Sequence, residues 1–275
     1  MSVLADGATE EDVSAAFHAF ARTQARGIST RYEVLAGAVA EQPRFAAPLL
    51  AAPASLRAPD LLFAAAQYTL RGEASGHPLA GYFPTLGGLG DPDDAMVRAF
   101  ANLVDEFGAP LTEVCAERPP QSNEAARCAV LRPALGLAAE VAGDRPLALV
   151  EVGASAGLLL LPDRYGYRYQ GLREYQGLRE QRCGRLDAPR RLVFACQVGG
   201  EAWPAGLDIE PDIADRVGID LAPLDATDPD DVRWLLASVC VARTRGAPGP
   251  VGGRARRGPV AAPAHQAGSS RRSPA

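Results

Sequence analysis

The chain has 275 residues, 47% of them hydrophobic, which suffices for one large domain or two small ones with a real core. All 28 basic residues are arginine against 33 acidic residues, and seven of these arginines lie in residues 241–275, so the preceding body is acidic. An acidic body repels phosphate backbones, and no apolar run reaches the roughly 18 residues of a membrane span, so we expect neither nucleic acid nor membrane as a partner.

The cellular setting is indicated by the amino-terminal stretch and by the cysteines. The stretch MSVLADGATEED is acidic and lacks the basic and apolar regions of a signal peptide, so we expect a cytoplasmic protein. The five cysteines include no CxxC pair, which argues against a zinc site or a disulfide framework and is typical of a reducing compartment. The absence of lysine, with much Ala, Gly and Pro, indicates a gene of high GC content.

Residues 1–118 favour an all-helical lobe. Its helix starts are marked by capping residues or by a proline at the first helical position: Thr9, Ser29, Pro59 and Asp91-Pro92. The helix that begins at Asp91-Pro92 is expected to end at Gly108.

Residues 119–240 favour a partial Rossmann-like α/β domain. The expected elements are a helix from about residue 122 to Ala142 with a kink at Pro133, strands at 147–150, 165–169, 191–198 and 219–224, and a short helix opened by Asp228-Pro229. The hexapeptide YQGLRE occurs twice in tandem over residues 169–180, fits no helical period, and is expected in a loop.

The stretch LALVEVGASAGLLLLPDR, residues 147–164, is the most informative part of the chain. An apolar run, a glycine-rich turn and a leucine run predict a strand, a tight loop and a helix. This is the first half of a βαβ unit, in which the loop after the first strand binds ligands.

Four motifs occur in order along the chain: HPLAGYFP (77–84), PPQSNEAARCAVLRPAL (119–135), LVEVGASAGLLLLPDRY (149–165) and LDATDPDDVRWL (224–235). Together they resemble an uncharacterised family of high-GC bacteria, domain of unknown function 2332, over about residues 10–240. The resemblance implies a fold like that of S-adenosylmethionine-dependent methyltransferases, preceded by a helical lobe. Family members usually have Asn at the position of Leu159 and a larger non-proline residue at that of Pro162.

Family members also continue well beyond position 240. Here residues 241–275 consist largely of Arg, Ala, Gly and Pro, with no acidic residue and no periodicity. We expect a disordered tail that is read out of frame, because GC-rich DNA in a shifted frame encodes this composition.

In the methyltransferase interpretation, the loop after the strand binds S-adenosylmethionine. Glu151 accepts a hydrogen bond from the amino group of the ligand, and the loop formed by Gly153, Ala154, Ser155 and Gly157 lies against its carboxylate. Asp225 is the candidate for the adenine side, and an acid about 20 residues after the loop is expected to hold the ribose.

The remaining candidates of this interpretation are less specific. Glu174 and Glu180 have the spacing expected of the ribose-binding acid. Gln121 and Asn123 are candidates for contacting the donor or the substrate, and His77 and Glu124 are candidates for catalysis. No metal site is expected.

Two other interpretations stay open. Residues 153–157 match G-x-S-x-G, the nucleophile elbow of serine hydrolases, with Ser155 as nucleophile. That chemistry needs a later histidine, and His265 in the tail is the only one after the loop. The third interpretation is a non-catalytic module that binds a ligand or a partner.

Overall fold

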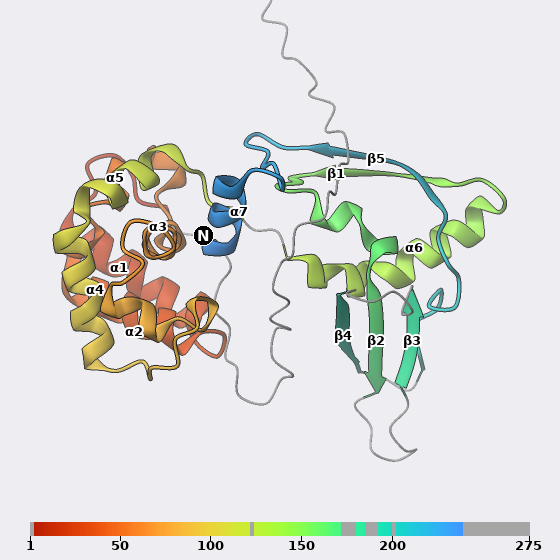
Figure 1. The fold of residues 1–275 in the computed structure, drawn as a ribbon, viewed down its shortest axis with the longest axis horizontal. Helices are drawn as coiled ribbons and strands as arrows, with labels where there is room; N and C mark the ends of the chain where they lie inside the picture. Colours follow the sequence, from red (N-terminus) through yellow and green to blue (C-terminus); the bar gives the residue numbers. More distant parts are fainter. Residues whose placement is uncertain (1–2, 122–123, 172–179, 185–191, 200–201, 239–275) are drawn as a thin grey trace, which may run out of the picture. The chain divides into compact units, whose positions relative to one another are not determined.

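The computed structural model describes residues 3–121, 124–171, 180–184, 192–199 and 202–238, and its fold is mixed α/β (Figure 1). The chain divides into two compact units. The first unit consists of two segments, one that ends at Ser122 and one that begins at Leu224, and the second unit extends between them from Asn123 to Pro223. The expected tail at 241–275 lies outside the described residues.

The first unit is helical. Its α-helices are α1 (Glu10–Phe20), α2 (Thr30–Glu41), α3 (Pro59–Leu70), α4 (Asp94–Glu106), α5 (Gly108–Glu117) and α7 (Pro229–Ala237). The predicted starts of the first three are confirmed: Thr9 forms a capping box with Asp12, Ser29 accepts a hydrogen bond from the amide of Tyr32, and Pro59 occupies the first turn of α3. None of the described helices is long and apolar enough to cross a membrane.

The predicted start of the fourth helix is wrong by two residues. The cap is Asp93 rather than Asp91, because the Oδ1 atom of Asp93 accepts hydrogen bonds from the amides of Ala95 and Met96, both at 3.0 Å. Gly108, expected only as a helix stop, is the first residue of α5.

The core of the first unit is built around Phe63 of α3. Its ring contacts those of Phe17, Tyr32 and Phe100, with centroids between 4.9 and 6.1 Å apart. Helix α7 joins this core through Trp234, which is 1% exposed. The segment that the sequence predicts in the second domain therefore completes the helical unit.

The second unit contains two small sheets and helix α6 (Cys128–Ala142), which has Pro133 inside it and ends at Gly143, where φ is 63°. In one sheet, β1 (Leu147–Val152) pairs in parallel with β5 (Ile213–Ile219). In the other, β2 (Gly166–Gly171) lies between β3 (Glu180–Gly184), which is antiparallel to it, and β4 (Val193–Val198), which is parallel.

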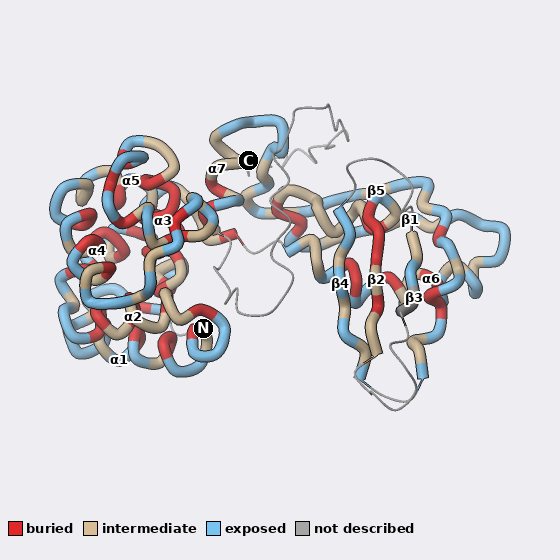
Figure 2. Tube along the Cα trace, turned by 60° about the horizontal axis from the view of Figure 1, so that its bottom comes forward, coloured by how far each residue is buried: buried red, intermediate tan, exposed pale blue. Residues whose placement is uncertain are grey.

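The second core is smaller and lies under β2, the most deeply buried of these strands (Figure 2). Its tyrosines bury their rings and donate hydrogen bonds from their hydroxyls to backbone carbonyls: Tyr165 to Leu158 at 2.9 Å, Tyr167 to Pro162 at 2.6 Å and Tyr169 to Ala129 at 2.7 Å. These bonds tie β2 to α6 and to the segment that follows β1.

Three predictions for this unit are wrong in whole or in part. The leucine run after the glycine loop forms only two 3₁₀ turns, Leu158–Leu160 and Pro162–Arg164, because Pro162 cannot donate the hydrogen bond that would continue an α-helix. The strand expected at 219–224 is instead β5, which ends at Ile219. Residues 169–171 of the tandem repeat belong to β2 and residue 180 belongs to β3, rather than to a loop, and residues 172–179 lie outside the described ranges.

The predicted strands at 147–150, 165–169 and 191–198 are confirmed with small shifts as β1, β2 and β4. Over the described residues, however, the strands form two sheets and not one doubly wound sheet. The parallel pair of β1 and β5 is the part that corresponds to a Rossmann-like arrangement, and the wider assignment stays a prediction.

Candidate functional site

The glycine loop 153–157 follows β1 and is held by the end of β5. The amides of Gly153 and Ala154 both donate to the carbonyl of Ile219, at 2.8 and 3.2 Å. The amide of Ser155 donates to the Oδ2 atom of Asp220 at 2.7 Å. Because β1 and β5 are parallel neighbours, their carboxyl ends meet at one edge of the sheet, which is where open α/β sheets bind ligands.

The backbone of the loop requires its glycines. Gly153 and Gly157 have φ values of 82° and 70°, in the left-handed region that residues with a Cβ rarely adopt. Ser155, at φ 50°, is the one residue other than glycine with a positive φ in the described chain. A serine in this region costs about 1–3 kcal/mol, so the surrounding contacts must hold it there.

Two polar atoms of this site are buried without a hydrogen-bond partner in the described structure. They are the Oε2 atom of Glu151 and the Oγ atom of Ser155, whose residue is 7% exposed. Burial raises the pKa of the Glu151 carboxyl above its usual value, while nearby Arg127 acts in the opposite direction and Asp220 adds to the rise. Unpartnered buried oxygens are uncommon because each costs about 1–3 kcal/mol, and they point to a ligand that supplies donors.

Asp220 is the site residue that the sequence analysis missed. Its carboxylate bridges two turns, since Oδ2 accepts from Ser155 and Oδ1 accepts from the amide of Ala222 at 2.9 Å. The adjoining Gly218 lies opposite Glu151 in the register, and a Cβ there would overlap the side chain of Ala154. The signal for it in the sequence is the run Gly-Ile-Asp, in which an acidic residue directly follows a short strand. Because this strand, β5, pairs with β1, the acid lies at the end of the strand beside β1.

The structure places Glu151 near the end of β1 and the four loop candidates, Gly153, Ala154, Ser155 and Gly157, directly after this strand, all within the second unit. Glu124 also belongs to this unit and is exposed ahead of α6. Asn123 and Glu174 lie outside the described residues, as does the side chain of Glu180.

The other candidates, His77, Asp225 and Gln121, belong to the first unit. The Nδ1 atom of His77 accepts from the amide of Leu79 at 3.2 Å, and burial lowers the pKa of the imidazole. Asp225 is exposed ahead of α7, and its Oδ1 atom accepts from the amide and hydroxyl of Thr227, which lowers the pKa of this carboxyl. Gln121 is buried near the end of this unit.

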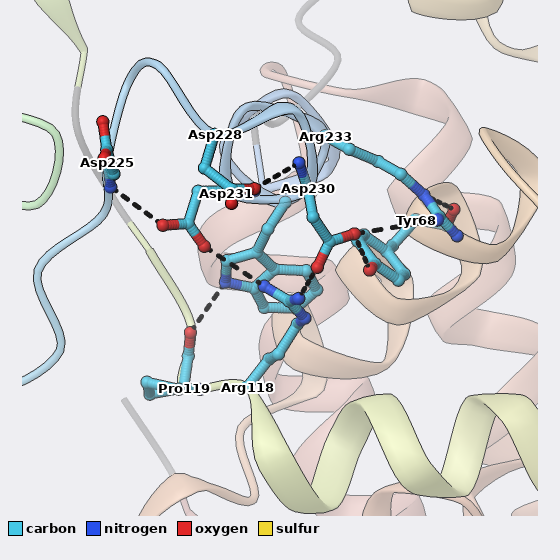
Figure 3. Close-up of polar contacts among 9 residues, drawn as sticks. Tyr68, Arg118, Pro119, Asp225, Asp228, Asp230, Asp231 and Arg233 are labelled. Carbon is cyan, nitrogen blue, oxygen red and sulfur yellow. Dashed lines mark hydrogen bonds and ion pairs between the residues drawn. The ribbon is translucent and has the colours of Figure 1, made fainter.

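The acidic residues Asp230 and Asp231 in the first turn of α7 stabilise the fold of the helical unit (Figure 3). Arg118 pairs with the carboxylates of Asp230 and Asp231 and lies over the rings of Tyr68 and Trp234, with its guanidinium carbon 4.9 and 5.9 Å from the two centroids. The indole nitrogen of Trp234 donates to a backbone carbonyl at 3.0 Å. These contacts fix α7 within the helical unit and leave the glycine loop as the candidate site of the second unit.

The chemistry available around the loop is limited. Residues 123–223 contain no histidine, so the unit that carries Ser155 offers carboxylates but no imidazole as a base. Among the described residues, no group of three or more His, Cys, Asp or Glu side chains is arranged to hold a metal ion. The arrangement is suited to binding a ligand that carries hydrogen-bond donors or positive charge.

Comparisons with known proteins place the chain in a family. Neither the curated proteins nor the solved structures yielded a match. A family model described as an uncharacterized protein conserved in bacteria, domain of unknown function 2332, matches residues 14–243 and so includes the helical unit, the glycine loop and α7. The chain therefore belongs to this bacterial family, domain of unknown function 2332.

Proposed function

We propose that the protein binds S-adenosylmethionine at the carboxyl ends of β1 and β5 and is methyltransferase-like, with an acceptor still to be identified. The observation that carries this proposal is the pair of buried oxygens without partners, Glu151 Oε2 and Ser155 Oγ, beside a loop of left-handed glycines. The ligand has an ammonium group and hydroxyls that supply the missing donors, and a carboxylate that suits backbone amides.

The main residues of the site then have defined parts in binding. Glu151 accepts a hydrogen bond from the ammonium group, and its negative charge balances the positive charge of the ligand. Asp220, at the end of the strand beside β1, joins Glu174 and Glu180 as a candidate for the ribose hydroxyls. Gly153 and Gly157 let the ligand approach the backbone closely.

The small number of acid–base groups fits this chemistry. When bound, S-adenosylmethionine supplies an electrophilic methyl group, and an acceptor that is already nucleophilic needs no general base. What the chain must provide is alignment of donor and acceptor, which can account for a large part of a rate enhancement. Glu151 and the loop would supply the donor half of that alignment.

Calorimetric titration with S-adenosylmethionine and S-adenosylhomocysteine tests this proposal. The Glu151→Gln variant should bind both about tenfold to a hundredfold more weakly, because a hydrogen bond to a charged group contributes roughly 1.5–3 kcal/mol. Glu140→Gln, an exposed change on α6, is the matched control and should bind as the unchanged chain does. The absence of binding to the unchanged chain, or equal binding by both variants, would refute the proposal.

The serine-hydrolase alternative keeps one observation in its favour. Ser155 has a positive φ and an unpartnered Oγ atom, as a residue on a nucleophile elbow would. A serine-reactive phosphonate should then label the chain, with the label lost in Ser155→Ala. A binding module should show neither this label nor methyl transfer.

A further inference from the structure

The first unit contains a surface cavity, widely open to solvent, that the proposed function leaves unused. It has a volume of about 520 Å³, within the range of small-molecule sites. It is bordered by the end of α3, the 3₁₀ turns at Pro78–Tyr82 and Pro84–Leu86, and α7. Two of the four motifs that carry the family resemblance, HPLAGYFP and LDATDPDDVRWL, contribute to its walls.

The lining of this cavity is mostly apolar, with a polar end. Its apolar residues are Leu70, Ala80, Leu86, Pro229, Val232 and Leu236. Its polar residues are Arg71, Ser75 and Arg233. An apolar wall beside two guanidinium groups is suited to a ligand with a hydrocarbon part and a negative charge.

Arg233 is already engaged within the protein. Its Nε atom donates to the carbonyl of Tyr68 at 3.0 Å, its guanidinium carbon lies 3.6 Å from the centre of that ring, and its Nη1 atom is 3.8 Å from a carboxylate oxygen of Asp230 (Figure 3). A Cβ on Gly72 would overlap this guanidinium group. Arg233 is therefore a fixed part of the wall, with its charge balanced by Asp230.

Arg71 differs from Arg233 because no carboxylate of the described chain pairs with it. Its Nε atom is buried without a partner, and an Nη2 hydrogen bond to the carbonyl of Leu236 is long, at 3.5 Å. Burial lowers the pKa of its guanidinium group below the usual value. A partly desolvated charge without a counterion is costly, and an anion in the cavity would reduce that cost.

We propose that this cavity binds a small amphipathic carboxylate, with its charged group on Arg71 and its hydrocarbon part against Leu70, Leu86 and Val232. The site belongs to the helical unit and does not depend on the glycine loop. A ligand there would contact α3 and α7 together, so its binding should stabilise the helical unit.

The test is calorimetric titration of the full chain with three probes of equal tail length: octanoate, octanol and octylammonium. Octanoate should bind, and octanol and octylammonium should bind at least about tenfold more weakly, because only the carboxylate pairs with the guanidinium group. Arg71→Gln should weaken octanoate by a similar factor, Arg71→Lys should restore part of the loss, and the exposed Arg22→Gln should change nothing. Equal binding of octanoate and octanol, or unchanged octanoate binding by Arg71→Gln, would overturn the proposal.

A second variant covers the case in which Arg71→Gln does not fold. Ala80→Leu adds bulk to the cavity wall and keeps every charge, and it should weaken octanoate binding. Unchanged octanoate binding by Ala80→Leu would show that the ligand binds elsewhere. Neither variant should alter binding of S-adenosylmethionine, so failure of one proposal can be told from failure of the other.

Discussion

Replacing Asp220 with asparagine should loosen the glycine loop. The carboxylate accepts the amide of Ser155 at 2.7 Å and that of Ala222 at 2.9 Å. Asparagine keeps one acceptor oxygen and turns an NH₂ group toward the other amide. One hydrogen bond to a charged group, worth roughly 1.5–3 kcal/mol, is therefore lost or reversed.

The loop cannot easily compensate for this loss, because Ser155 already holds a positive φ that costs about 1–3 kcal/mol. We expect the free energy of opening the loop to fall by about 2 kcal/mol, which corresponds to roughly 30-fold faster amide exchange.

Hydrogen–deuterium exchange of the peptide that spans residues 153–157 measures this change. Asp208→Asn, an exposed substitution in the same unit, is the control and should leave that peptide unchanged. Unchanged exchange of residues 153–157 in Asp220→Asn would refute the argument that this carboxylate holds the loop.

Three further predictions concern pH, packing and the α7 contacts. Burial raises the pKa of the Glu151 carboxyl in the folded state above its ordinary value of 4.5, so the folded state binds this proton more tightly than the unfolded state does. The stability that results is fully present below pH 4.5 and is lost as the pH rises through the raised pKa. Thermal melts should accordingly show the unchanged chain losing stability relative to Glu151→Gln as pH rises from about 4. Gly136→Ala should destabilise the second unit by about 1–3 kcal/mol in urea unfolding, because its Cβ would overlap a facing carbonyl, whereas Gly37→Ala meets nothing within 4 Å and should stabilise by up to about 1 kcal/mol. Arg118→Ala should lower the stability of the helical unit by about 1–2 kcal/mol in thermal melts followed by far-UV ellipticity, because the ion pairs with Asp230 and Asp231 and the contacts of the guanidinium group with two aromatic rings are lost together, and Arg118→Lys should restore only part because it cannot form the same planar contacts.

Helix starts could be predicted from the sequence because capping is local chemistry. Thr9 and Ser29 bond to amides within three residues, and Asp228 does the same ahead of α7. The choice between Asp91 and Asp93 could not be made in this way. Both can cap a helix, and local pattern alone does not distinguish them.

The strand β5 and the site residue at its end were harder to predict because tertiary contacts determine them. Arg216 is a charged residue within this strand, and it is accommodated by an ion pair with Asp163 at 2.7 Å and a hydrogen bond to the carbonyl of Leu160 at 2.8 Å. A prediction from the apolar pattern therefore puts the strand at 219–224, which is later in the chain than β5. Asp220 then falls inside the predicted strand instead of after its end.

The glycine loop itself was predictable, because Gly153 and Gly157 flank a turn that needs positive φ. The helix after it was not, because four leucines favour a helix and the effect of Pro162 is felt across the preceding turn. The partnerless oxygens of Glu151 and Ser155 depend on how β1 and β5 pack, which no local pattern contains.

Photolabelling with methyl-radiolabelled S-adenosylmethionine, followed by peptide mapping, most directly tests whether the glycine loop is a methyl-donor site. We expect the label in the peptides that contain residues 147–164 or 213–223, and its loss in the presence of excess S-adenosylhomocysteine. A chain that takes up no label, or takes it up only in the helical unit, would contradict this assignment.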